Sequence, residues 1–291
     1  MYKIQFSFFT ATTAILSVLR CRLFTVSGEP VYGVTSLDGE IFLLRPKRER
    51  DQVEVYDVIT HRLQRCLTVP NSRSFIDMTS CEHYHCLYIS DPVVKCVHRL
   101  DVGLQGAATQ WPVNDVSFGI SVNAAHNVIV TCRRVRKIKE FSSHGDLVRE
   151  LTLHDDVIHP RHTIQALSGQ FIVCHGWADD PINRVCMISA DGRHIVHSHG
   201  GQRGSYIGQY NEPTHLAVDD SEFVYVTEFD NRRVTLLSPT LDYIRQVVSS
   251  DKLKWQPHRL YLDVQRRRLY VTDNEFKDGK FTAGRVAVFN V

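Results

Sequence analysis

Three histidines occupy similar places in the second half of the chain and could together bind a metal ion. His162 lies in PRHTIQ, His215 in PTHLAV and His258 in PHRLYL, each near the start of an apolar segment that follows a proline. Three neutral imidazoles are a competent ligand set for a catalytic zinc ion. Their offsets differ, because His162 and His215 follow the proline by two residues and His258 by only one. A shift of one residue turns a strand side chain to the opposite face, so we predict a polar channel lining and neither metal nor cofactor.

The segment from Cys81 to Cys86, CEHYHC, offers a second combination of metal-ligating side chains. Two thiols and two imidazoles, those of His83 and His85, fall within six residues. The segment also separates two strand-like runs, however, and the cysteines stand at their ends. We therefore interpret it as a turn whose cysteines face inward and not as a zinc site.

A basic run in the middle of the chain could bind single-stranded RNA. It consists of Arg133, Arg134, Arg136, Lys137 and Lys139. RNA recognition would require these side chains to share one surface with loop aromatics on which bases can stack. The competing interpretation is that they keep a sheet edge soluble.

Sequence motifs typical of catalytic sites are absent from the chain. It contains no glycine loop for nucleotide phosphates, no GxSxG element and no HExxH helix. We therefore predict that the chain is not an enzyme and that it binds a protein partner through exposed aromatic and arginine side chains in loops. The candidate contact residues are Trp177, Tyr206, Tyr210, Phe229 and Arg232.

The elements that would position these residues come from an internal repeat. Six short runs rich in β-branched and aromatic residues recur at intervals of 41 to 53 residues. They are EIFLLR, CLYISD, NVIVTC, QFIVCH, FVYVTE and RLYVTD. Such intervals are typical of the blades of a β-propeller.

Each copy carries the same order of four strand-like runs separated by polar turns, and no helical periodicity interrupts it. The sequence therefore predicts an all-β, six-bladed β-propeller with four-stranded antiparallel blades. The last copy stops one strand short at Val291. We predict that the segment from Arg22 to Ser27 supplies the missing strand and closes the ring, which would remove exposed sheet edges.

Composition agrees with one globular domain, assigned to residues 22–291. The formal charge is only +2, so no overall field attracts DNA or an anionic membrane. The eight cysteines are dispersed through apolar runs, which indicates buried thiols in a monomeric cytoplasmic protein. Residues 1–21 contain an uncharged stretch from Phe6 to Leu19, too short for a membrane span. It is read as an apolar leader, with a secretory signal peptide, and hence secretion, as the alternative.

The stretch HGGQRGSYIGQYNEPTHLAVDDSEFVYVTEFDNRRV resembles an NHL repeat. The positions that match are Gly201, Gly204, Gly208, Pro213, Asp219, Asn231, Arg233 and Val234. The other copies keep mainly the strand pattern. This resemblance implies a six-bladed propeller similar to the one at the C-terminus of tripartite-motif proteins, where it recruits protein or RNA for an upstream ubiquitin ligase. No RING, B-box or coiled-coil pattern occurs in this chain.

These observations lead to one function and two alternatives. The first is a non-catalytic interaction scaffold, related to the substrate-recognition modules of ubiquitin-ligase proteins, that binds a protein on its inter-blade loops. The second is an NHL propeller that binds single-stranded RNA. The third follows from the similarity of His162, His215 and His258 to the zinc-binding histidines of amidating lyase propellers, and it would make the chain a metal-dependent lyase.

Overall fold

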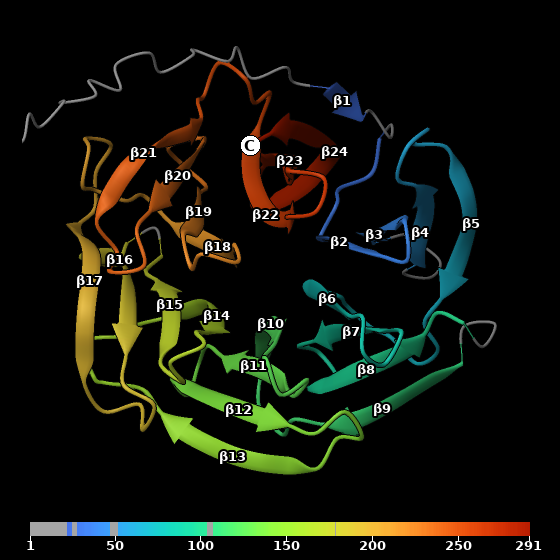
Figure 1. The fold of residues 1–291 in the computed structure, drawn as a ribbon, viewed down its shortest axis with the longest axis horizontal. Helices are drawn as coiled ribbons and strands as arrows, with labels where there is room; N and C mark the ends of the chain where they lie inside the picture. Colours follow the sequence, from blue (N-terminus) through green and yellow to red (C-terminus); the bar gives the residue numbers. More distant parts are fainter. Residues whose placement is uncertain (1–21, 25–27, 47–51, 104–106, 178) are drawn as a thin grey trace, which may run out of the picture.

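The computed structural model describes residues 22–24, 28–46, 52–103, 107–177 and 179–291. These residues form six four-stranded antiparallel sheets arranged in a ring around a central axis (Figure 1). The predicted all-β, six-bladed propeller is therefore confirmed. The described residues contain no helix long and apolar enough to cross a membrane.

The first three blades follow the order predicted from the repeat, with the innermost strand first. Blade one contains β2 (Gly33–Leu37), β3 (Glu40–Arg45), β4 (Gln52–Asp57) and β5 (Leu63–Thr68). Blade two contains β6 (Asp77–Cys81), β7 (Cys86–Asp91), β8 (Cys96–Asp101) and β9 (Ala108–Pro112). Blade three contains β10 (Ser117–Val122), β11 (Val128–Cys132), β12 (Lys137–Phe141) and β13 (Leu147–Thr152).

The remaining blades repeat this order. Blade four contains β14 (Pro160–Gln165), β15 (Phe171–His175), β16 (Ile182–Ile188) and β17 (Ile195–Gln202). Blade five contains β18 (Pro213–Val218), β19 (Val224–Glu228), β20 (Arg233–Leu237) and β21 (Tyr243–Val248). Blade six contains β22 (Gln256–Asp263), β23 (Arg268–Lys277), β24 (Lys280–Asn290) and the N-terminal β1 (Arg22–Phe24).

Strand β1 closes the ring as predicted. It pairs antiparallel with β24, with Arg22 opposite Val288 and Phe24 opposite Val286. The first and last described strands thus share one blade, and the last blade has its fourth strand like the others. The apolar leader predicted for residues 1–21 lies outside the described residues.

The hydrophobic core is divided among the spaces between neighbouring blades. One cluster joins Phe42 and Val55 of blade one to Leu87 and Ile89 of blade two, and equivalent clusters follow around the ring. The second strand of every blade is almost completely buried, which explains its apolar run in the sequence. Six of the seven described cysteines are buried in this core as expected, and Cys66 is exposed.

Irregular pairing shapes the innermost strands where they meet the channel. In blades four and five the register shifts between Pro160 and His162 and between Pro213 and His215. In blade six it shifts between Pro257 and Leu260. Such bulges re-aim side chains. They turn the residues just after each proline toward the channel.

Candidate functional site

Two cavities lie on the channel axis, one at each end. The larger, which we call the funnel pocket, has a volume of about 480 Å³. It is lined by Tyr32, Ser74, Phe75, Ile76, Phe118, Arg133, Arg161, Trp177, Glu212, Phe229, Asp230, Gln256, His258, Phe276 and Phe281. The smaller, about 280 Å³, is lined by residues one step further along the inner strands, among them Met78, His162, His215 and Leu260.

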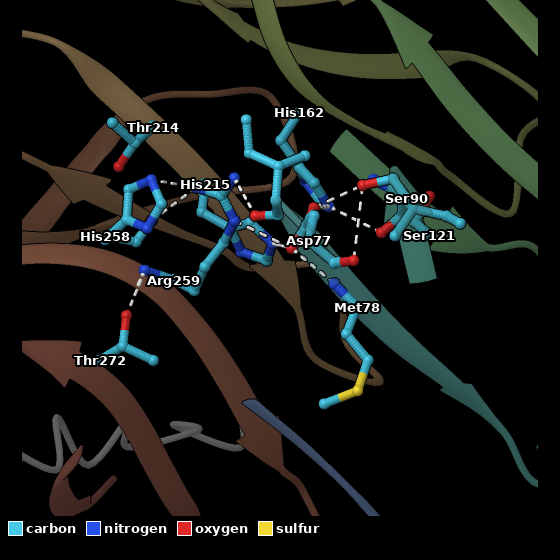
Figure 2. Close-up of polar contacts among 12 residues, drawn as sticks. Asp77, Met78, Ser90, Ser121, His162, Thr214, His215, His258, Arg259 and Thr272 are labelled. Atoms are coloured by element: carbon cyan, nitrogen blue, oxygen red, sulfur yellow. Dashed lines mark hydrogen bonds and ion pairs between the residues drawn. The ribbon is translucent and has the colours of Figure 1, made fainter. Parts of the chain in front are cut away.

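Asp77 and Arg259 separate the two cavities. Asp77 follows Ile76 of the funnel pocket and precedes Met78 of the smaller cavity, and Arg259 lies between His258 and Leu260 in the same way. Arg259 Nε donates to Asp77 Oδ1 over 2.9 Å (Figure 2), and Arg259 Nη2 donates to the Ile76 carbonyl over 2.9 Å. Both side chains are buried, so this pair forms a polar plug across the channel.

His162 and His215 complete the plug beside Asp77. Their Nε2 atoms lie 3.8 Å and 3.4 Å from the Asp77 carboxylate, and their ring centroids are 3.8 Å apart. Burial raises the pKa of Asp77, but Arg259 and the two histidines outweigh it and hold that pKa well below its usual range. Burial lowers the pKa of both histidines, most strongly that of His162. Both imidazoles are therefore neutral and the aspartate is charged.

The three side chains Asp77, His162 and His215 have ligand atoms within 4.8 Å of one another, close enough to consider a metal ion. Arg259, however, already neutralises Asp77. His162 Nε2 lies 3.2 Å from the Ile120 carbonyl, which can only accept, so this nitrogen carries a proton and has no lone pair for a metal. A divalent cation would have to displace both contacts and face the guanidinium. In the arrangement seen, Asp77 and His162 Nε2 are therefore already engaged within the protein.

His258 does not join the other two histidines. Its Nε2 accepts from Arg259 Nη1 over 2.9 Å, and its ring lies against Phe281 with centroids 4.8 Å apart. The offset seen in the sequence explains this difference, because Arg259 is the residue that follows Pro257 by two. The structure thus brings together two of the three predicted channel histidines and places the third in the funnel pocket.

The strongest positive charge of the funnel pocket comes from two arginines that share one tryptophan. The guanidinium carbons of Arg133 and Arg161 each lie 4.2 Å from the Trp177 ring centroid. The same two groups lie 5.2 Å and 4.9 Å from the ring of Phe118. Cation–π contacts hold both side chains in place without neutralising them.

Arg161 is buried and forms no ion pair with a carboxylate among the described residues, although Glu212 is near enough to act on its charge. It is 3% exposed, and its Nε and Nη1 atoms have no hydrogen-bond partner among the described residues. Burial, together with repulsion from Arg133 and Arg259, lowers the pKa of Arg161 to about 9. Burial likewise lowers the pKa of Arg133. Because a buried unpaired charge is costly, this corner of the pocket is built to receive an anion.

Glu212 is a titratable group in the lining of the funnel pocket. It lies just before β18 with a backbone φ of 53°, a left-handed conformation that is uncommon for a residue other than glycine. Glu212 is 5% exposed, and its carboxyl group forms no ion pair with a cationic side chain among the described residues. Burial raises the pKa of Glu212 in spite of the nearby Arg161. A strained backbone and a perturbed carboxyl in one cavity are typical of functional sites.

The funnel pocket also has an apolar side, which consists of aromatic side chains from blade six and its neighbours. Phe276 and Phe281 pack edge to face with centroids 5.3 Å apart, and Phe229 lies 5.6 Å from Phe276. Tyr32 lies 5.6 Å from Phe281. The funnel pocket therefore has one cationic side and one aromatic side.

The predicted protein-contact residues are only partly available at the surface. These residues lie in three loops, and each of the three loops contributes to the lining of the funnel pocket. Trp177 lines the pocket and is 37% exposed, and Tyr206, outside the lining, is 80% exposed. Tyr210 and Phe229 are buried, which makes the prediction of partner contacts wrong for both, because they pack between strands and against the hairpin of blade six. Arg232 is committed to the Leu253, Lys254 and Trp255 carbonyls.

The basic run does not form one free surface. Lys139 is buried and paired with Asp115 and Glu150, and Lys137 also pairs with Glu150. Arg136 pairs with Asp155, whereas Arg133 lies in the funnel pocket and Arg134 stands apart on the turn. The shared RNA-binding surface expected for these residues is therefore not formed.

The matching NHL positions hold a loop in place. Arg233 donates to Glu228 Oε1 over 2.7 Å and to the carbonyls of Ser205 and Gln209, and Asn231 donates to the carbonyl of Gly204. These contacts brace the loop that leads into Glu212. Their role in this chain is structural.

Sequence reasoning passed over Arg161, Glu212, Asp77 and Arg259. A usable signal existed for three of them, because Asp77, Arg161 and Arg259 are charged residues near the start of inner strands. Charged residues are rarely buried without a purpose. Glu212 carried no comparable signal, since it lies in a polar loop.

No protein-family model and no curated protein matches the sequence. Among solved structures, a streptogramin B lyase is 11% identical with a TM-score of 0.64, covering 94% of this chain and 97% of that one. A virginiamycin B lyase from Staphylococcus aureus is 9% identical with a TM-score of 0.62, covering 94% and 99%. A gluconolactonase-like protein is 11% identical with a TM-score of 0.69, covering 94% and 92%. At this identity the likeness shows the fold alone.

These structures correct one prediction. The absence of catalytic sequence motifs led us to predict that the chain is not an enzyme, yet lyases are among the six-bladed propellers that it matches over nearly its whole length. The reason is physical: propeller sites are assembled from single residues of several blades, which leave no local motif. The matches also do not single out NHL propellers.

Proposed function

We propose that the protein is an enzyme that binds a small organic anion in the funnel pocket and acts on it by proton transfer. The observation that carries this proposal is the buried Arg161, whose Nε and Nη1 lack partners while Arg133 adds a second positive charge across Trp177. These two donors are enclosed in the structure, so a carboxylate or phosphate group entering beside the Arg161 guanidinium would satisfy them after a small rotation of that side chain, because guanidinium groups bind such oxyanions bidentately.

A third unpaired donor stands in the same pocket. Arginine can only donate, so His258 Nε2 accepts from Arg259 and the ring proton sits on Nδ1. That Nδ1 has no partner among the described residues. Burial keeps the pKa of His258 well below its usual range, so it acts as a neutral donor. It would orient the substrate beside the two arginines.

Glu212 is the residue that we assign to proton transfer. Its raised pKa brings it closer to neutral pH, where a carboxyl both gives up and takes back a proton readily. Water is partly excluded by the surrounding aromatic rings. Two of the similar structures are lyases, which makes an elimination next to the anionic group the first reaction to test.

The test combines binding and turnover. We would screen a panel of carboxylates, phosphate esters and sulfates by thermal shift, and then follow each bound compound for chemical change. Arg161→Gln is expected to abolish binding, and Glu212→Gln to retain binding while abolishing turnover. Arg245→Gln, at an exposed site on β21, is the matched control. Binding that survives Arg161→Gln would refute the proposal.

The loop after Gly201 favours a second role, contact with a protein partner. Tyr206 and Ile207 are strongly exposed apolar side chains on a loop that Arg233 holds in place. Large exposed apolar residues on a braced loop are typical of interaction sites. A photo-crosslinking residue at position 206 should capture a specific partner that one at Ile244 does not, and equal capture at both would remove this role.

A further inference from the structure

The hairpin between β23 and β24 is longer than its counterparts. These strands contain ten and eleven residues, whereas the second and third strands of the other blades contain five to seven. The pairing continues to Lys277 opposite Lys280. Asp278 and Gly279 form the turn, with φ values of 52° and 77°, as a tight two-residue hairpin requires. The hairpin therefore extends as an ordered element past the body of blade six.

The extension brings two phenylalanines to the funnel pocket. Phe276 and Phe281 are a cross-strand pair near its tip, and both line the cavity. With Tyr32 and Phe229 they form what we call the aromatic wall. Phe276 remains 42% exposed, which leaves apolar surface in contact with solvent at the cavity. Burying that surface against a ligand would be favourable.

The aromatic wall shares one cavity with the cationic corner formed by Arg133, Arg161 and Trp177. His258 lies in the same cavity, where its ring packs on Phe281 and its Nε2 is fixed by Arg259. A volume of about 480 Å³ lies within the usual range for sites of small organic ligands. An inorganic anion would satisfy the arginines and leave the aromatic wall uncovered.

We propose that the funnel pocket selects organic anions that carry an aromatic ring a short distance from the charged group. The ring would pack on Phe276 and Phe281, and the anionic group would accept hydrogen bonds from Arg161. This inference rests on the proposed function and specifies its substrate class.

Isothermal titration with matched probes tests the inference on the full chain. The aromatic anions are phenylacetate, 3-phenylpropionate and phenyl phosphate, and their partners without the ring are acetate, propionate and methyl phosphate. The neutral probe is 3-phenylpropanol. We expect at least one aromatic anion to bind at least about tenfold more tightly than its ring-free partner, and 3-phenylpropanol to bind more weakly than 3-phenylpropionate.

Two variants separate the contributions of the two walls. Phe276→Ser should remove the preference for the ring and leave the affinity for the ring-free anions unchanged, and folding should persist because the side chain is half-exposed near a hairpin tip. Ile244→Ser, at another exposed apolar side chain, is the control and should change neither.

The outcomes distinguish the inference from the function on which it rests. Equal affinity for aromatic and ring-free anions, with binding lost in Arg161→Gln, would overturn the aromatic preference and leave an anion-binding enzyme standing. Absence of binding by every anion, or binding unaffected by Arg161→Gln, would overturn both. A ring preference that persists in Phe276→Ser and in Phe281→Ser would overturn the role of the hairpin.

Discussion

Arg161 shows how a single residue can favour function over stability. Its charge is removed from water and repelled by Arg133 and Arg259, and it is offset by cation–π contacts and by the nearby carboxyl of Glu212 without an ion pair to a described carboxylate. Replacing an uncompensated buried charge by an apolar side chain of similar length is often stabilising. The unliganded protein therefore carries a cost at this residue that an anionic ligand would remove.

Arg161→Met should accordingly stabilise the unliganded protein while abolishing anion binding. We expect the free energy of unfolding to rise by about 1–3 kcal/mol, measured by urea denaturation. Arg149→Met, which removes the partner of Glu140, should lower it. A loss of stability in Arg161→Met would mean that the guanidinium is satisfied inside the protein, and the anion site would then lose its basis.

Glu212 should make anion binding depend on pH. Below its raised pKa the carboxyl is neutral, and above it a negative charge appears beside the arginines. Affinity for a carboxylate, which stays ionised over this range, should therefore fall as pH rises through that pKa. Titration calorimetry from pH 5 to pH 8 measures this decline. Glu212→Gln should bind with an affinity that no longer changes over the interval, and an unchanged decline in this variant would assign the titration to another group.

At the scale of elements, the closeness of neighbouring inner strands positions the site. Gly119 in β10 faces β14 so closely that a Cβ atom there would lie 2.5 Å from the Arg161 carbonyl oxygen and 2.8 Å from the His162 Cα. Only a residue without a side chain allows this approach. The strand that carries Arg161 is thereby fixed against Phe118, over whose ring its guanidinium lies.

Gly119→Ala should push the two strands apart. We expect it to destabilise the protein by about 1–3 kcal/mol, as overpacking does, and to weaken anion binding by moving Arg161. Thermal denaturation and calorimetry measure the two effects. The control is Gly103→Ala, where a Cβ atom would meet nothing within 4 Å. Equal stability of both variants would show that the strands separate without cost.

The elements were largely predictable from the sequence, and the site was not. The repeated apolar runs, the turn between Cys81 and Cys86, and the closing segment after Arg22 all follow from local periodicity. The contact between Asp77 and Arg259 joins residues 182 positions apart across the ring. No local pattern encodes such a pairing. The different offset of His258 from its proline was visible in the sequence. That Arg259 takes the place corresponding to His162 and His215 became clear only from the bulges in the structure.

For the whole molecule, ring closure turns six blades into one structure with a buried interior. Every inner strand packs against two neighbours, and β1 links the first described residues to the last blade. The interior therefore holds several polar groups away from water. Among them are the neutral histidines His162, His175 and His258.

These histidines should make the folded state sensitive to mild acid. Burial holds the pKa of His175 at about 3 and the pKa of His162 and His258 well below the usual value. The unfolded chain takes up these protons below pH 6.5 or so, while the folded protein does not. Their contribution is therefore complete above about pH 6.5 and lost as the pH falls, at about 1.4 kcal/mol per pH unit for each histidine.

Urea denaturation between pH 7 and pH 5 measures this slope while most carboxylates remain ionised in both states. His175→Gln keeps an acceptor for the Arg184 Nε, which donates to His175 Nε2 over 3.0 Å, and removes one titrating group. Its slope should be smaller by an amount that grows from a small value at pH 7 toward about 1.4 kcal/mol per pH unit at pH 5, whatever its stability at pH 7. The exposed His144→Gln serves as the comparison and should keep the slope of the unmodified protein. If His175→Gln kept that slope as well, His175 would have to gain its proton in the folded state, and the effect of its burial on its pKa would be absent.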